Sequence, residues 1–185
     1  MNGKKFLELN DMILIAVFAA LLCITAPFSV PIGPVPVSLA TFTVYLAGAM
    51  LGKKRAPLAV LVYILLGTVG LPVFSGFRGG LQVVAGVTGG YILGYIPCAF
   101  VAGLFTERRL GKGFADALGM VLGTLCCYAF GTVWFIIATG TGLAPALMTC
   151  VVPFLPGDAA KILAASALAA LLRPALGRLK LTQRL

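Results

Sequence analysis

The last long apolar run of the chain opens with Val152-Pro153-Phe154-Leu155-Pro156-Gly157-Asp158-Ala159-Ala160-Lys161. An acid and a base, Asp158 and Lys161, stand three residues apart in it, directly after two prolines and a glycine. Ionisable side chains inside a membrane segment are costly and are candidates for function. Residues at i and i+3 share a helix face, so the two side chains are expected to meet. Two simpler roles stay open: Asp158 as a helix cap, and Lys161 as a side chain that reaches for the membrane interface.

Apolar residues dominate the rest of the chain as well. Of 185 residues, 61% are hydrophobic and 10% are charged, and the mean hydropathy is +1.08. Soluble domains carry roughly 25% charged residues, so we predict an integral membrane protein with a single domain over residues 1–185. We expect the first apolar run to be retained rather than cleaved as a signal peptide, because further apolar segments follow it.

Six apolar segments have lengths that suit membrane helices, each of which needs about 20 residues to cross a bilayer. Prolines, glycines or basic clusters separate these segments. The predicted spans are 12–28, 37–51, 57–69, 81–106, 115–139 and 157–172. The predicted fold class is therefore an all-α membrane protein, a compact bundle of six transmembrane helices.

The basic residues predict the orientation of this bundle. If the spans alternate in direction, every Lys and Arg except Arg78 and Lys161 falls at one end of the bundle or in the adjoining tails. Basic segments stay in the cytoplasm, so both termini are predicted to be cytoplasmic. Asp158 and Lys161 then lie near the outer end of the sixth span, beside the loops 31–36 and 74–80. The net charge of +9 reflects these basic clusters and does not indicate nucleic-acid binding.

Small residues recur four positions apart in several spans, which lets helix backbones approach closely. These residues are Ala16 and Ala20, Gly48 and Gly52, Gly86, Gly90 and Gly94, and Gly119 and Gly123. Packing within the bundle is the simpler interpretation. A docking face for another membrane protein is the alternative.

The sequence offers few of the residues and motifs that catalysis or metal binding requires. The chain has no histidine, which removes the commonest general base and metal ligand. Its five cysteines lie in apolar runs without a CxxC pair, so we expect buried, structural thiols rather than a metal or disulfide site. No phosphate-binding motif is present. We predict no catalytic residue, no metal and no cofactor, and we interpret the chain as a binder of a small, partly apolar anion.

Outer residues near the acid–base pair could complete a pocket. Arg78 is either a solvated loop residue or an anion contact. Tyr91 either packs at the interface belt or faces a ligand, with glycines before it that permit close approach. Phe74 and Phe77 are candidate apolar walls, and core packing is the simpler role for Trp134.

Four motifs, in order and spacing, resemble the BioY family, the biotin-specific substrate-binding (S) component of energy-coupling factor (ECF) transporters. They are Pro34-Val35-Pro36-Val37-Ser38-Leu39, Tyr63 to Phe74 with its Gly70-Leu71-Pro72-Val73, Gly86 to Tyr95 with its Thr88-Gly89-Gly90-Tyr91, and Pro156 to Lys161. Val87 replaces a proline that is usual in the third motif, and Ala40 stands where glutamine is common.

The resemblance implies a subunit of the bacterial cell membrane that captures biotin outside with high affinity. Its partners would be membrane lipid, a membrane scaffold subunit and two cytoplasmic ATPases, which use the ATP. Asp158, Lys161 and Tyr91 would contact biotin, Thr88, Gly89 and Gly90 would shape the pocket, and Ala16 and Ala20 would dock on the scaffold.

Biotin carries a carboxylate, a thioether ring and a ureido group. We assign the carboxylate to Lys161, while Asp158 orients Lys161 or accepts a ureido N–H. Tyr91 and Phe74 would pack the ring system. A further polar contact after the third span falls to Ser75, Arg78 or Gln82. The alternative functions are an S component or carrier for another anionic vitamin and, with less support, an intramembrane lipid-modifying enzyme.

Overall fold

Helices make up most of the structure, a computed structural model that describes residues 9–31, 34–107 and 114–178. Three described stretches have the length and apolar composition to cross a membrane: Gly89–Glu107, Phe114–Thr139 and Leu143–Pro174. A shorter apolar helix covers Leu9–Thr25. These features agree with the predicted membrane protein.

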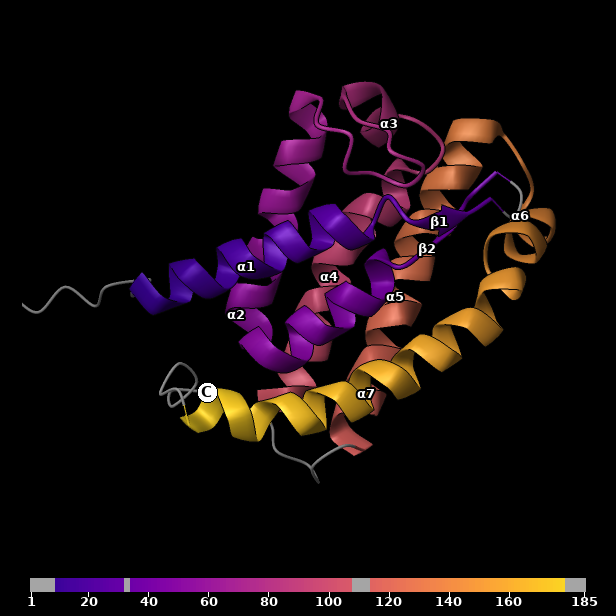
Figure 1. Cartoon of the computed structure of the whole chain (residues 1–185). Coiled ribbons are helices and arrows are strands. Elements are labelled where there is room, and N and C mark those ends of the chain that lie inside the picture. Colours follow the sequence, from indigo (N-terminus) through magenta and orange to yellow (C-terminus); the bar gives the residue numbers. More distant parts are fainter. Residues whose placement is uncertain (1–8, 32–33, 108–113, 179–185) are drawn as a thin grey trace, which may run out of the picture.

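The elements follow one another as a chain of helices with one small hairpin. They are α1 (Leu9–Thr25), β1 (Ser29–Val30), β2 (Val37–Ser38), α2 (Ala40–Val69), α3 (Leu81–Ala85), α4 (Gly89–Glu107), α5 (Phe114–Thr139), α6 (Leu143–Cys150), the 3-10 turn η1 (Val152–Phe154) and α7 (Leu155–Arg178). Helix α4 packs between α2 and α5, and α7 lies along one side of the bundle (Figure 1).

The predicted second and third spans are two arms of α2, joined by a bend rather than a loop. Gly52 has φ 76° and ψ 178° inside the helix, a left-handed backbone angle that glycine adopts without a steric penalty. Figure 1 shows the two arms of α2 diverging from each other. The basic triplet 53–55, which the sequence predicts to end the second span, belongs to the second arm of α2.

The predicted fourth span is also interrupted. Helix α3 ends at Ala85, Gly86 is extended with φ −77° and ψ −173°, and α4 begins only at Gly89. The Trp134 indole Nε1 donates to the Gly86 carbonyl at 2.9 Å, which holds the break against α5. This contact confirms the packing role expected for Trp134.

Most of the small residues serve packing inside the bundle. A Cβ at Gly48 would lie 2.6 Å from Ala102 Cβ, and one at Gly94 would lie 3.2 Å from Cys127 Cα. Such contacts confirm internal packing for these glycines, because only a bare backbone lets the helices approach so closely. Ala16 and Ala20 differ, since both lie on the exposed face of α1.

Three ion pairs join the helices at the end of the bundle that carries the α2 bend. Lys53 pairs with Glu107 at 2.9 Å and Arg55 with Asp11 at 3.0 Å. Arg173 of α7 pairs with Asp116 of α5 at 2.7 Å. These pairs connect α2 with α1 and α4, and α7 with α5, at the end opposite the β1–β2 hairpin.

Candidate ligand site

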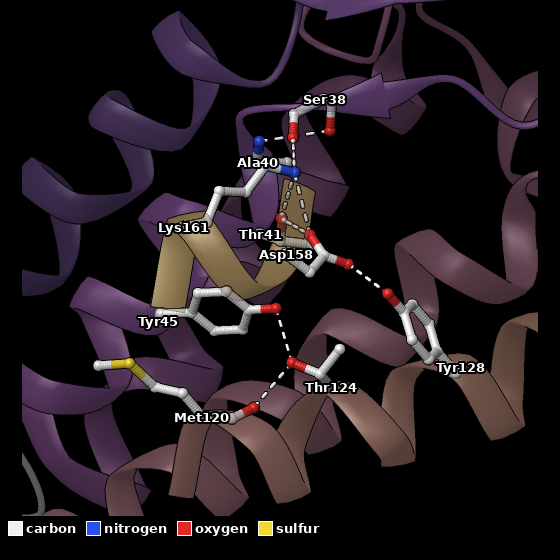
Figure 2. A network of polar contacts seen from close by, with 9 residues as sticks. All are labelled: Ser38, Ala40, Thr41, Tyr45, Met120, Thr124, Tyr128, Asp158 and Lys161. Carbon is white, nitrogen blue, oxygen red and sulfur yellow. Dashed lines mark hydrogen bonds and ion pairs between the residues drawn. The ribbon is translucent and has the colours of Figure 1, made fainter. Parts of the chain in front are cut away.

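Asp158 and Lys161 form a close ion pair in the first turns of α7. The Lys161 Nζ lies 3.0 Å from Asp158 Oδ1, and the side chains are 13% and 5% exposed, respectively. Helix α7 turns both groups toward the beginning of α2 and toward α5 (Figure 2). Neither of the simpler roles describes this arrangement, because the lysine bonds inward and the carboxylate bonds to other helices. We refer to the pair as the dyad.

The ammonium group of Lys161 uses all three of its donors within the protein. Besides Asp158 Oδ1, it donates to the Ser38 carbonyl at 2.7 Å and to Thr41 Oγ1 at 3.1 Å. Ser38 ends β2 and Thr41 lies in the first turn of α2. The dyad therefore ties α7 to the hairpin and to α2.

The carboxylate of Asp158 is satisfied on both oxygens. Oδ1 accepts from Thr41 Oγ1 at 3.2 Å as well as from Lys161, and Oδ2 accepts from the Tyr128 hydroxyl at 2.5 Å. Figure 2 shows Tyr128 reaching Asp158 from α5, with the Tyr45–Thr124 hydrogen bond of 2.6 Å beneath it. The result is a charge-neutral, fully bonded polar cluster in an apolar setting.

Two small cavities and an open groove lie in succession from the dyad, each sharing lining residues with the next, and we refer to this succession as the path. The first cavity, about 30 Å³, is bounded by the dyad, Ser38, Thr41 and Tyr128. The second, about 20 Å³, shares four lining residues with the first: Val35, Pro36, Tyr91 and Tyr95. Each cavity has room for about one water molecule, so a larger ligand requires the lining residues to move.

The groove, about 410 Å³, lies at the other end of this path. It shares Arg78, Val83 and Thr88 with the second cavity. The path therefore runs from a buried polar dyad, past tyrosine rings, to an arginine. Surfaces in this order suit a ligand with a polar head, an apolar body and a charged end.

The structure brings together most, but not all, of the predicted site residues. Tyr91 borders both cavities, and its hydroxyl donates to the Cys150 carbonyl at 3.3 Å. Phe74, Ser75, Arg78 and Thr88 line the second cavity. Phe74 also packs edge-to-face on Tyr63, with ring centroids 5.6 Å apart.

Gly89 and Gly90 line none of these three spaces. A Cβ at Gly89 would clash with the Val84 carbonyl, and one at Gly90 would clash with Trp134. Their observed role is close packing where α4 begins. Phe77 also lies outside the path: it is 62% exposed and packs edge-to-face on Phe28 at 5.7 Å.

Several lining residues escaped the sequence prediction. They are Val35, Pro36, Ser38, Thr41, Tyr95, Cys127, Tyr128 and Phe154. One signal was available: Thr124, Tyr128 and Thr132 recur every four residues and place hydroxyl groups on one face of an otherwise apolar α5. Ser38 lay within the motif 34–39, but nothing in the sequence linked its backbone carbonyl to a lysine 123 positions away.

Comparison with known proteins places this geometry in context. The model of the BioY family matches residues 1–178. The biotin transporter BioY of Thermotoga maritima is 40% identical over 161 residues, which cover 87% of this chain and 94% of the relative. The probable biotin transporter BioY of Pyrococcus horikoshii is 39% identical over 155 residues, covering 84% and 91%. A crystal structure of the S-component for biotin from an ECF-type ABC transporter superposes with a TM-score of 0.84 at 25% identity, covering 94% of this chain and 95% of that one.

Proposed function

Because the chain belongs to the BioY family, we propose that it captures biotin as the S component of an ECF-type transporter. Its fold and family are those of a transporter rather than an enzyme. The observation that carries the proposal is the buried Asp158–Lys161 dyad at the head of a path lined by tyrosines, in a chain that superposes over 94% of its length on a biotin S component.

The surfaces of the path correspond to the chemical parts of biotin. The dyad and Arg78 offer partners for a ureido group and a carboxylate, and the rings of Tyr91, Tyr95 and Phe74 offer apolar contact for the bicyclic ring and its chain. Thr88 and Ser75 contribute hydroxyl groups to the walls. Gly89 and Gly90 act indirectly, by letting α4 begin close to α5.

The membrane arrangement is part of the proposal. Six spans correspond to α1, the two arms of α2, α4, α5, and the stretch formed by α6 and α7. Both termini lie in the cytoplasm of a bacterial cell whose plasma membrane holds the protein. The basic residues at the bend end of the bundle support this orientation, and the site then opens outward beside the β1–β2 hairpin.

Transport requires partners in this scheme. A membrane scaffold subunit and two ATPases would energise release into the cell, and the ATP would be used by those partners, so this chain holds no cofactor. The exposed small residues Ala16 and Ala20 on α1 are the proposed docking contacts, because small side chains let a second helix approach closely.

Calorimetry of the purified full chain with biotin tests the proposal. We expect one site, and we expect Asp158→Asn/Lys161→Met, which removes both charges at similar volume, to weaken binding by about 2–5 kcal/mol. That loss corresponds to at least about thirtyfold in Kd. Lys54→Gln, an exposed base at the bend end, should bind normally. Binding of another anionic vitamin in place of biotin would favour the alternative S component.

A further inference from the structure

Helix α7 is attached to the bundle by a second buried acid, at the opposite end from the dyad. The Arg173 Nη2 of α7 donates to the Asp116 carboxylate of α5 at 2.7 Å and to the Ala49 carbonyl of α2 at 3.1 Å. Thr106 of α4 donates to the same carboxylate oxygen at 2.9 Å. We refer to Arg173 and Asp116 together as the anchor. The dyad and the anchor therefore attach α7 to the same two helices, α2 and α5.

Between these two attachments, α7 meets the bundle mainly through small side chains. Ala165 and Ala169 are fully buried and Ile162 is buried beside them, whereas Leu163 and Leu171 are exposed on the other side of the helix. Alanine side chains are short and reach little into the grooves of a neighbouring helix, where longer side chains would interdigitate. The tilt and the axial position of α7 therefore depend on its two polar attachments.

The stretch of α7 between the attachments acts as one rigid lever. It contains neither glycine nor proline from Asp158 to Arg173, and Pro174 follows directly. Lys161 and Arg173 are about 18 Å apart along the helix axis, so a tilt of about 3° about the anchor would move Lys161 by about 1 Å. Such a displacement is enough to lengthen the 2.7 Å bond from Lys161 to the Ser38 carbonyl beyond hydrogen-bonding distance.

The bonding of the anchor favours placement of α7 over stability of the fold. One guanidinium nitrogen contacts one oxygen of Asp116, whereas arginine and a carboxylate frequently form two parallel bonds. The other oxygen, Oδ2, is buried, and no described residue donates to it. An unsatisfied buried acceptor lowers stability. In exchange, the same nitrogen reaches both Ala49 and Asp116, which fixes Arg173 between α2 and α5.

We propose that Arg173 and Asp116 are positioning residues for ligand binding: the anchor sets the tilt of α7 and thereby holds Asp158 and Lys161 in the geometry that receives the ligand. The inference rests on the proposed function and adds to it two residues that line neither the cavities nor the groove. Coupling between two sites is reciprocal, so a ligand that orders the dyad also strengthens the anchor at the far end of α7.

Biotin affinities of anchor variants of the full chain test the proposal. Asp116→Asn/Arg173→Met removes the anchor without leaving a buried charge, so the protein should fold. It should bind biotin about five- to thirtyfold more weakly than the wild type, within the range of coupling between separate sites. Arg173→Lys keeps a cation beside Asp116 and should bind more tightly than that double variant. Lys53→Gln breaks an ion pair at the same end that does not involve α7, and it should bind like the wild type.

A cycle with the dyad separates positioning from general destabilisation. Effects at distant, independent sites multiply in Kd. If the anchor acts through the dyad, adding Asp116→Asn/Arg173→Met to Asp158→Asn/Lys161→Met should weaken binding by less than about threefold further, since independent sites agree with simple multiplication to about this precision. A larger further loss, or an anchor variant that binds biotin like the wild type, would overturn the proposal.

Amide hydrogen exchange of the wild-type chain supplies a test that needs no variant. Biotin should slow exchange in residues 166–173 as well as in the first turns of α7, and more than in α1. Helix α1 serves as the control because, in the described part of the chain, it contributes no bond to the dyad or the anchor. Protection confined to the first turns of α7 would contradict the coupling. Absence of biotin binding by the wild-type chain would instead refute the proposed function, so the two failures are distinguishable.

Discussion

Removing the charge of Lys161 alone should destabilise the protein more than removing both charges of the dyad. At 3.0 Å, unit charges attract by about 5–6 kcal/mol at an effective dielectric constant of about 20, but the desolvation of both groups offsets most of this attraction. Lys161→Met leaves a carboxylate that is 5% exposed with only Thr41 and Tyr128 as donors. Breaking a buried pair in this way costs about 3–5 kcal/mol, and we expect the lower half of that range because these two donors remain.

The double variant Asp158→Asn/Lys161→Met removes the uncompensated charge. Its main loss is the bond to the Ser38 carbonyl, worth about 1 kcal/mol. We therefore expect the double variant to be at least about 1–2 kcal/mol more stable than Lys161→Met. For a chain of 185 residues this difference corresponds to roughly 2–8 °C in Tm.

Thermal unfolding in detergent, followed by the fluorescence of the single tryptophan, measures the difference. Trp134 is bonded to Gly86 and reports on the packing of the α3–α4 break against α5. A double variant no more stable than Lys161→Met would refute the reasoning. It would mean that solvent screens the dyad and that Asp158 carries no desolvation cost when it is left alone.

Three further predictions concern packing, the second buried acid and docking. Gly48→Val should lower stability by about 1–3 kcal/mol, since even a Cβ there would lie 2.6 Å from Ala102 Cβ; chemical denaturation measures it. Arg173→Gln should cost about 3 kcal/mol or more, because it leaves the Asp116 carboxylate, 2% exposed, without its cation; thermal unfolding measures it. Ala16→Leu should leave folding and biotin binding unchanged but abolish biotin uptake in cells that supply the scaffold and ATPases, because it fills the proposed docking face.

Each of these variants has a matched control in the chain. Gly142→Ala should be neutral, because the nearest heavy atom to its Cβ would be 3.7 Å away. Lys54→Gln removes an exposed base near the bend of α2. Val17→Leu enlarges a neighbouring side chain of α1 that is already large and 55% exposed. Uptake that survives Ala16→Leu, or a Gly48→Val protein as stable as Gly142→Ala, would contradict the corresponding prediction.

The sequence predicted the bounds of some helices closely and missed a break in another. The predicted span 115–139 is nearly the observed helix Phe114–Thr139, because in a membrane one continuous apolar run satisfies its backbone hydrogen bonds within itself by forming a helix. The predicted span 81–106 is broken at Gly86, although glycines there suggested only close packing. A glycine permits extended backbone, but the bond from Trp134 to the Gly86 carbonyl depends on a neighbouring helix that the local pattern does not specify.

By itself, the sequence determined that this chain is a membrane protein, which apolar runs form its helices, and that Asp158 and Lys161 meet on one helix face. Hydrophobicity and helical spacing are enough for these conclusions. Only the tertiary structure decided that Ser38, Thr41 and Tyr128 complete the dyad, and that Arg78 stands at the far end of the same path. The physical reason is that lipid is as apolar as a protein core, so hydrophobic patterning does not reveal which face of a helix points inward. The partners of a buried polar group are then fixed by how the helices pack.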